Sequence, residues 1–469
     1  MSSTAIQTEP AASVATARPK RAAAGLVLGL ACAADAMVGL DMAIVNVALP
    51  SIQRDLGVGQ GAVQWVIVAY GLLLGGFLLF GGRLGDQLGR KRVFIAGLAV
   101  FTVSSLLAGL AAEAWQLIAA RAVQGFGAAL IAPTALSLLA VSYAEGRERN
   151  RALGIFGAVG GVSGSVGVVA SGLLTGGPGW RWGFLINVPA GILMITLAAV
   201  FLASDRVTRR TARLDTAGAT TVTGGLLLLV YALHHGASHG WLTWSTLALA
   251  AAAVALLIVF VRIERRSANP LVPPSTWRNR TLVVANAAAF LTTCAFLSFI
   301  FIASLLMQQV LGYSPQLTGL AWLATTATIF PVAMIGGRLT ALVGVRPLLV
   351  VGLGLFAAGA FWLGRVPATG SYWTDLLPSF LAAGIGFGLC VPALQVGALA
   401  GVSEKDSGLA SGLVETMREV GGAAGVAAVS TVLVAGSGLA GFHLAFLFIG
   451  IVAALALVTA ALGFAGRRA

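Results

Sequence analysis

Long apolar stretches, separated by short polar segments, run through almost the whole chain. A helix needs about 20 mainly apolar residues to cross a bilayer, and fourteen stretches of the chain meet this requirement. The pattern therefore predicts an all-α polytopic membrane protein with fourteen transmembrane (TM) helices. Because that number is even, both termini are predicted on the same side of the membrane. The predicted spans lie near residues 24–50, 60–80, 93–111, 115–141, 152–175, 183–203, 216–236, 243–262, 281–310, 316–341, 346–365, 374–400, 408–433 and 440–464.

The composition and the placement of charge support this topology. Only 10% of the 469 residues are charged, against about 25% in soluble proteins. Most of the 29 Lys and Arg residues fall in segments that the span order puts on the same side of the membrane as the N-terminus. Lys and Arg accumulate in cytoplasmic loops. We interpret the net charge of +13 as orientation and contact with membrane lipids, without a nucleic-acid partner. The same charge asymmetry predicts both termini in the cytoplasm. Arg-rich, Lys-poor usage with abundant Ala and Gly favours a bacterium, and hence a bacterial inner membrane.

One segment occurs twice. GGRLGDQLGRKR at 81–92 returns as GGRLTALVGVRP at 336–347, with Ala341 in place of Asp86. The copies follow the second and tenth predicted spans, which indicates two related six-helix halves separated by two additional helices. Parallel repeats of this kind are typical of transporters that rock one half against the other. The predicted domains are a disordered cytoplasmic tail (1–22), an N-terminal six-helix bundle (23–204), a two-helix insert with basic linkers (205–280), a C-terminal six-helix bundle (281–465) and a cytoplasmic tail (466–469).

Four segments together resemble the major facilitator superfamily (MFS), specifically its fourteen-span drug:proton antiporter branch. They are GGRLGDQLGRKR at 81–92, LDMAIVNVALPSI at 40–52, RAVQGFGAALIAPTALSLL at 121–139 and WRWGFLINVPAG at 180–191. The resemblance implies the MFS fold, with two six-helix bundles plus two additional central helices. It also implies proton-coupled export and a gating role for the first segment. In that role, charge contacts of Asp86 and Arg90, with Gly85 and Gly89 beside them, stabilise the outward-facing state.

Few ionisable residues fall inside the predicted spans, and such groups are costly in hydrocarbon unless they perform a function. Asp41 is our first candidate for the proton-coupling carboxylate, because it could hold either a proton or a cationic substrate. The alternative is a structural partner for Arg121 or for backbone groups near Pro50. Asp35 is a second candidate acid, placed either at the cavity or nearer its cytoplasmic mouth.

Two further spans contribute candidates. The resemblance implies that Arg121 takes part in proton transfer; the alternative is an anchor near the outer headgroups. Glu415 forms either an internal ion pair with Arg418 or a second site for proton or substrate. The predicted proton-coupling set is Asp41, Asp35, Arg121 and Glu415, and the predicted substrate-binding set is Asp41, Gln124, Asn46 and Glu415.

The source of energy is predicted to be the proton gradient. None of the three lysines ends a G-x-x-x-x-G-K-[ST] loop, and no HExxH motif is present. We therefore expect no enzyme activity, no catalytic residue, no metal and no cofactor. The leading hypothesis is a monomeric, proton-coupled efflux transporter for small amphipathic or cationic drugs or a secondary metabolite. The alternatives are a facilitator or symporter for a small polar metabolite and, from another class, a transport-inactive membrane sensor.

Overall fold

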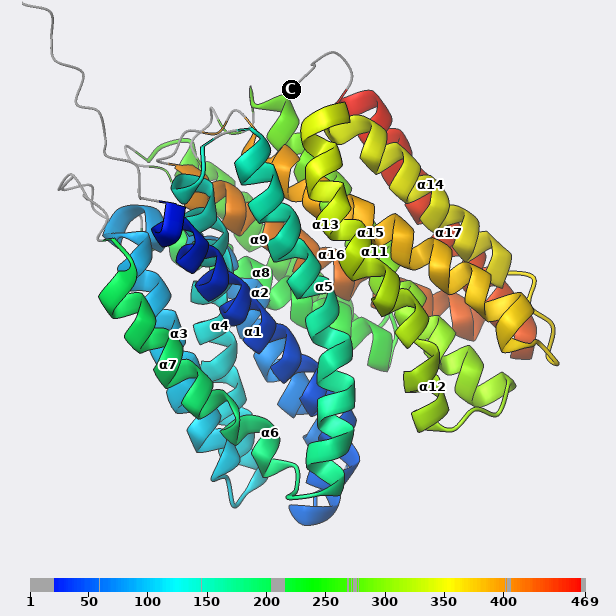
Figure 1. Ribbon diagram of the computed structural model, residues 1–469. Coiled ribbons are helices and arrows are strands. Elements are labelled where there is room, and N and C mark those ends of the chain that lie inside the picture. The colour runs from blue at the N-terminus through cyan, green and yellow to red at the C-terminus, as the bar shows by residue number, and fades with distance from the viewer. Residues whose placement is uncertain are drawn as a thin grey trace, which may run out of the picture.

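A computed structural model describes residues 21–58, 60–144, 146–203, 216–267, 278–400 and 406–464, with residues 270, 272, 276 and 402. All regular structure in these ranges is helical (Figure 1). The N-terminal half contains α1 (Arg21–Asp55), α2 (Gln60–Leu88), α3 (Arg90–Gly109), α4 (Ala114–Ser142), α5 (Arg147–Gly176), α6 (Arg181–Leu185) and α7 (Asn187–Phe201). The insert contains α8 (Thr216–His239) and α9 (Trp244–Glu264). The C-terminal half contains α11 (Arg280–Leu305), η1 (Leu306–Val310), α12 (Pro315–Ala321), α13 (Leu323–Val343), α14 (Val345–Leu363), η2 (Tyr372–Leu376), α15 (Leu377–Leu399), α16 (Ser407–Ala435) and α17 (Gly438–Gly463).

Twelve helical segments of the described ranges are long and apolar enough to cross a membrane. The predicted count of fourteen is therefore not confirmed by length and composition. The two long helices outside this set are α5 and α8, and the apolar run of α8 among the described residues is Ala217–Leu233. Both still form long helices within the assembly.

The 81–92 segment is not the loop that the sequence predicts. The second helix continues through Gly81, Gly82 and Asp86 to Leu88, and the third begins at Arg90. Only Gly89 separates the two helices, with a φ of 100° that glycine adopts without steric cost. In the second copy Gly344, with a φ of 85°, separates α13 from α14 in the same way. The repeat is thus confirmed as a repeated helix–glycine–helix corner.

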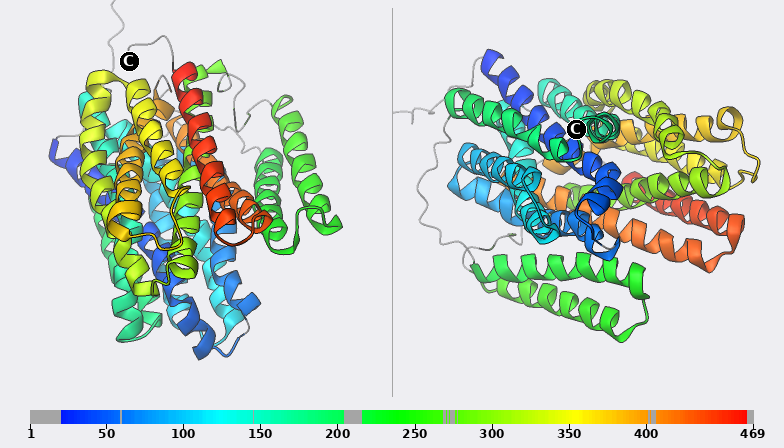
Figure 2. Two further views of the ribbon diagram at one scale, coloured as in Figure 1. Left: turned by 90° about the vertical axis from the view of Figure 1, so that its right-hand side faces the viewer. Right: turned by 90° about the horizontal axis from the view of Figure 1, so that it is seen from below.

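The two halves converge at one end and diverge toward the other (Figure 1). We call the end that holds the α2–α3 corner and the start of α16 the gate end, and the opposite end the far end. Figure 2 shows α8 and α9 as a separate pair along one side of the molecule. The eighth helix packs against both α2 and α16. The insert is therefore central in the sequence but lies at the edge of the assembly.

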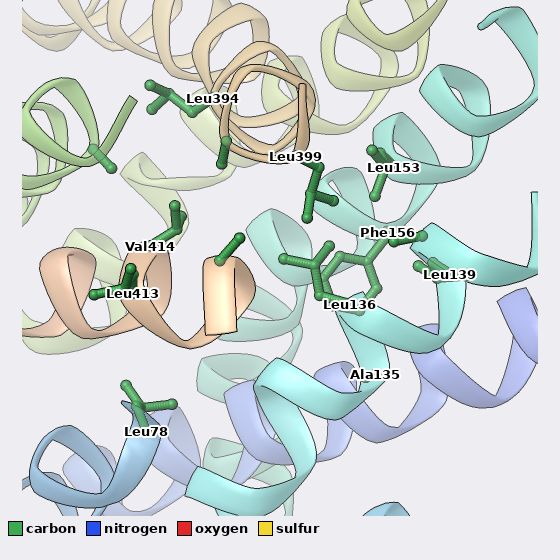
Figure 3. Close-up of a cluster of buried hydrophobic side chains, with 14 of the residues drawn as sticks. Leu78, Ala135, Leu136, Leu139, Leu153, Phe156, Leu394, Leu399, Leu413 and Val414 are labelled. Carbon is green, nitrogen blue, oxygen red and sulfur yellow. The ribbon is translucent and has the colours of Figure 1, made fainter. Parts of the chain in front are cut away.

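The apolar core follows the same division. One cluster joins the halves and includes Leu136, Phe156, Leu399 and Leu413 (Figure 3). Two further clusters stay within one half each. One contains Ile52 and Phe184 of the N-terminal half, and the other contains residues of the C-terminal half such as Phe299 and Phe446. Van der Waals packing of apolar side chains stabilises helix contacts in a membrane, so the halves are held together chiefly where the first cluster lies.

Glycines permit the closest contacts between the halves. A Cβ on Gly82 of α2 would lie 3.0 Å from the carbonyl carbon of Gly408 at the start of α16. At the other contact, a Cβ on Gly154 of α5 would lie 2.7 Å from the Cα of Gly337 of α13. Small residues allow helix backbones to approach this closely in a membrane. Because Gly82 and Gly337 occupy equivalent positions of the repeat, the two seams are related by the internal symmetry.

Replacing Gly154 by leucine should force α5 and α13 apart. Overpacking of this kind typically costs ~1–3 kcal/mol, so we expect purified Gly154→Leu to unfold at a lower temperature than the unmodified chain. Gly164→Leu is the matched control on the same helix, because nothing lies within 4 Å of a Cβ at that position. Equal melting temperatures for the two variants would contradict the close contact.

Candidate functional site

Asp41 lies inside the N-terminal half and is fully buried. Its two carboxylate oxygens accept hydrogen bonds from Arg121 Nη1 at 2.5 Å and from Gln124 Nε2 at 2.8 Å. Asn187 Nδ2 also donates to Asp41, at 2.9 Å. Because the acid and the guanidinium are both enclosed, their charges compensate each other in a place where neither could remain alone.

The same network fixes Arg121. Its Nε donates to the carbonyl of Val66 at 3.1 Å, and its Nη1 donates to Gln124 Oε1 at 2.7 Å. The guanidinium carbon lies 4.0 Å above the ring of Tyr70, a cation–π arrangement. Ser105 of α3 accepts a further hydrogen bond from Gln124 at 2.8 Å. Side chains from five helices therefore meet around one ion pair.

The structure thus brings together three of the predicted site residues, Asp41, Arg121 and Gln124. Arg121 is only 1% exposed, so it does not lie among the headgroups. In this conformation Asp41 and Gln124 have no exposed surface for a substrate. The side chain of Asn46 lies outside the described part of the structure.

Sequence reasoning did not single out Asn187, Ser105 or Tyr70 as members of this network. Asn187 lies in the WRWGFLINVPAG segment and is the one of the three that a sequence signal could have found, because an amide inside a predicted span needs polar partners. Serine and tyrosine are common in helices for other reasons, so their part in the network becomes visible only in three dimensions.

A second cluster of charge lies between the halves. Asp35 is six residues before Asp41, about 120° away around the helix, and it points to Gly160 of α5, where a Cβ would lie 2.6 Å from its Oδ2. It interacts electrostatically with Glu415 and Arg418 of α16. Arg418 Nη1 donates to both carboxylate oxygens of Glu415, at 2.9 and 2.8 Å.

Glu419 completes this second cluster, one helical turn beyond Glu415. It interacts electrostatically with both Arg418 and Glu415. We call Asp35, Glu415, Arg418 and Glu419 the interface cluster. It contains three acids and one base, contributed by both halves, and Arg418 and Glu415 keep 32% and 11% of their side chains exposed.

The gate residues make direct contacts across the seam between α2 and α16. Asp86 accepts hydrogen bonds from the backbone N–H groups of Gly408 at 3.0 Å and Leu409 at 2.9 Å. These N–H groups belong to the first turn of α16, where a carboxylate is favoured by unpaired donors and by the helix dipole. Arg90 donates to Asp86 at 3.2 Å and to Ser407 at 3.1 Å. Asp86 and Arg90 of the predicted gating set therefore lie at a contact between the halves, whereas Gly85 packs against Thr134 of α4 in the same half.

The other seam loosens with distance from the gate end. Beyond the contact of Gly154 with Gly337, α5 and α13 border an apolar cavity of about 490 Å³. Its lining includes Val162 of α5 and Leu323 and Phe330 of α13. The halves are thus in close contact at the gate end and leave space between them farther along.

Two helical bundles that share a core at one end and hold charged residues between them have the architecture of a membrane transporter that rocks one half against the other. The family model of the Major Facilitator Superfamily matches residues 31–426 and 285–469. The chain therefore belongs to the Major Facilitator Superfamily, as its motifs predict.

Two relatives within the superfamily and one solved structure resemble the chain over most of its length. The chain is 39% identical to the cephamycin export protein CmcT of Amycolatopsis lactamdurans, over 90% of this chain and 87% of that protein. It is 40% identical to the puromycin resistance protein pur8 of Streptomyces alboniger, over 87% and 81%. Among solved structures, the human organic anion transporter MFSD10 (TETRAN) superposes with a TM-score of 0.68 at 16% identity, covering 93% of this chain and 99% of that one. This last likeness shows the fold alone.

Removing Arg121 should destabilise the N-terminal half strongly, because Asp41 would remain buried without its partner. Breaking a buried ion pair in this way typically costs ~3–5 kcal/mol. We expect Arg121→Gln to unfold at a much lower temperature than the unmodified chain, and Asp41→Asn in the same chain to restore part of the loss. Thermal unfolding of the purified protein measures both.

The control is the exposed pair at the far end. Arg181 and Trp180 donate hydrogen bonds to Asp55, which hold the pKa of Asp55 below its usual value. Arg181 and Asp55 keep 39% and 46% of their side chains exposed, and exposed pairs contribute little to stability. Arg181→Gln should therefore melt close to the unmodified chain. If Arg121→Gln did so too, the buried pair would not be the strong contact described here.

Replacing Asp86 by asparagine should weaken the gate, because a neutral amide interacts less with the α16 N-terminus and with Arg90. In a chain whose three cysteines are replaced by alanine, a cysteine at the buried Ser411 reports gate opening through its rate of maleimide labelling. We expect Asp86→Asn to raise that rate several-fold. Asp375→Asn, in a half-buried acid remote from the gate, is the control; equal rates in the two variants would contradict the assignment.

Proposed function

We propose that this protein is a proton-coupled exporter of amphipathic antibiotics or other secondary metabolites, working by alternating access. The observation that carries the proposal is the interface cluster, in which an acid of the N-terminal half interacts electrostatically with Glu415 and Arg418 of the C-terminal half. A carboxylate there can hold a proton or attract a cationic group, but not both at once. Competition for such a site is sufficient for antiport, because neutralising the acids by either ligand lets the halves come together.

The conformation of the halves supports alternating access. The gate end is closed by apolar contacts, by glycines and by the contacts of Asp86, whereas the far end has separate cores in each half. The gate end also carries Arg83, Arg90, Lys91 and Arg92, and a concentration of cations favours the cytoplasmic side. On this orientation the structure is the outward-facing state, and both termini lie in the cytoplasm of a bacterial inner-membrane protein.

We further propose that the chain crosses the membrane fourteen times. The fifth helix has 30 residues and runs alongside its neighbours from the gate end to the far end (Figure 1). The eighth helix has 24 residues and packs on α2, α16 and α9. A helix of that length can span a bilayer, and burial against neighbours relieves the need for an apolar surface on every side.

The two acid sites have different parts in this proposal. Asp35 and Glu415 lie where the halves meet, so they are the first groups that a proton or substrate from the far end would reach. Asp41 is a second proton site, enclosed with Arg121, and its protonation would remove the charge that holds the guanidinium. Asn46 and Gln124 remain candidate substrate contacts for a conformation in which this network has opened.

The names of the relatives support the choice of substrate class, since one is called an export protein for cephamycin and the other a resistance protein for puromycin. Many antibiotics carry both polar and apolar groups, which suits apolar walls such as those between α5 and α13 together with the acids of the interface cluster. We expect one chain in contact with membrane lipids to suffice, with the proton gradient in place of a cofactor.

Expression in a drug-sensitive bacterium tests this function. The unmodified chain should lower the accumulation of puromycin or a related antibiotic, and an uncoupler that collapses the proton gradient should abolish the effect. Asp35→Asn should lose most of the export, because the amide cannot release a proton. Asp55→Asn, which changes an exposed acid at the far end of the same helix, should export normally.

Two results would contradict the proposal. Accumulation that is the same with and without the protein, across a panel of amphipathic antibiotics, would exclude export. Export that persists unchanged in Asp35→Asn and Glu415→Gln, or in the presence of the uncoupler, would exclude proton coupling through the interface cluster.

A further inference from the structure

A second cavity lies at the far end of the C-terminal half, between the end of α14 and the start of α17. Its volume is about 390 Å³, and among the described residues it is lined by Phe361, Gly364, Arg365, His443, Leu444 and Leu447. The two helices pack on each other (Figure 1). The cavity shares no residue with the acid sites or the gate, and it combines two side chains that can carry positive charge with apolar walls.

Arg365 follows the last turn of α14, and its side chain is exposed. Its guanidinium group forms no ion pair with an acid in the described part of the chain. Arg181, at the far end of the other half, is different, because it donates a hydrogen bond to Asp55 and lies over the ring of Trp180 at 4.4 Å. The positive charge of Arg365 is therefore available to an anion from outside the chain.

His443 is tied to the segment that carries Arg365. Its Nε2 donates to the carbonyl oxygen of Val366 at 2.9 Å, and Nε2 carries the proton of this bond because a carbonyl oxygen only accepts. A second proton on Nδ1 would make the ring a cation with two donors, and a bound anion favours that charged form. The cavity thus presents an anion with one permanent positive charge and with a second group that can acquire one.

Two tryptophans place the cavity at the level of the lipid headgroups. Trp362, one turn before Arg365, is 49% exposed, and Trp373 in η2 is 73% exposed. Tryptophan is enriched where the bilayer meets water. Arg365 and His443 therefore lie at the depth of the lipid phosphates, in the leaflet nearest the far end.

The apolar wall of the cavity continues along α17 as an exposed face. The residues of this face are each 46–65% exposed and are Leu444, Leu447, Ile451, Leu455, Val458 and Leu462. Spacings of three and four residues put them on one side of the helix, and α17 lies at the surface of the molecule (Figure 2). A ligand with a charged head and a long apolar chain fits this arrangement, with its chain along α17.

We propose that this cavity binds an anionic phospholipid of the phosphatidylglycerol class, with Arg365 and His443 on its phosphate and α17 along one acyl chain. A guanidinium group can form two charge-assisted hydrogen bonds with a phosphate. None of the six lining residues is an acid, so the ammonium group of phosphatidylethanolamine would have no partner beside two cationic side chains. Charge complementarity therefore favours a lipid with a net negative charge.

A lipid bound in this way joins the end of α14 to the start of α17. A ligand that binds only the folded state stabilises it by mass action, so the lipid adds to the stability of the C-terminal half. The site uses none of the acids of the interface cluster, and it therefore does not depend on proton-coupled export.

Native mass spectrometry of the purified full-length chain, titrated with dioleoylphosphatidylglycerol, tests the inference. The measured quantity is the apparent Kd of the first bound lipid. Arg365→Gln should raise this Kd roughly 10-fold or more, because charge-assisted hydrogen bonds to the phosphate are lost. The substitution is at an exposed position and should leave the fold intact. His443→Gln should raise the Kd by a smaller factor, since Arg365 remains.

Arg181→Gln is the matched control, because it removes the same charge at the far end of the other half; its Kd should equal that of the unmodified chain. Dioleoylphosphatidylethanolamine has the same acyl chains and should bind the unmodified chain roughly 10-fold more weakly. Inorganic phosphate in large excess should not displace the lipid, because it lacks the apolar part.

An unchanged Kd in Arg365→Gln overturns the site. An equal rise in Arg181→Gln also overturns it, because that result indicates a diffuse attraction of lipid to any cation at the far end. Equal binding of the two lipids overturns the choice of an anionic headgroup, and displacement by inorganic phosphate would identify a site for free anions instead. Because binding is measured without transport, none of these outcomes is an outcome for the proposed export, which its own experiment in cells decides.

Discussion

Confinement of contact between the halves to one end of the molecule is the constraint on which the rest of the structure depends. At the gate end a single apolar core runs through both halves, and glycines bring backbones of opposite halves together at both seams. Small residues give close contact with little side-chain entropy to lose, so the seams can form and break repeatedly.

The two seams achieve closure differently, although the repeat relates them. Asp86 adds charge-assisted hydrogen bonds to the contact of α2 with α16, and its equivalent in the second copy is Ala341, which has no polar group. At the equivalent place of the seam between α5 and α13, the backbones of Gly154 and Gly337 are in close contact. The insert packs on the first seam, against α2 and α16. The first seam is therefore reinforced by the charge of Asp86 and by extra helices.

Much of this arrangement could be predicted from the sequence, and the remainder has clear physical reasons. Apolar length predicts most of the spans, and the repeated segment predicts equivalent corners at Gly89 and Gly344. The prediction of a loop at 81–92 is wrong because charges and glycines within a helix look like a turn when their partners on α16 are unknown. The different orientations of Asp35 and Asp41, about 120° apart around the helix, follow from helix geometry. Which of them faces the other half depends on Arg121 and Asn187, whose spatial positions no local pattern reveals.

The central claim is that protonation controls the rocking of the halves. Double electron–electron resonance between spin labels at the far ends of the two halves tests it most directly. Leu110 and Leu317 are 65% and 54% exposed and lie at the far end, one in each half. In lipid nanodiscs the account predicts a long distance at alkaline pH and a growing population at a shorter distance as the pH falls. That shift should be absent when Asp35, Glu415 and Glu419 are all replaced by amides. A single distance that does not change between acidic and alkaline pH would contradict it.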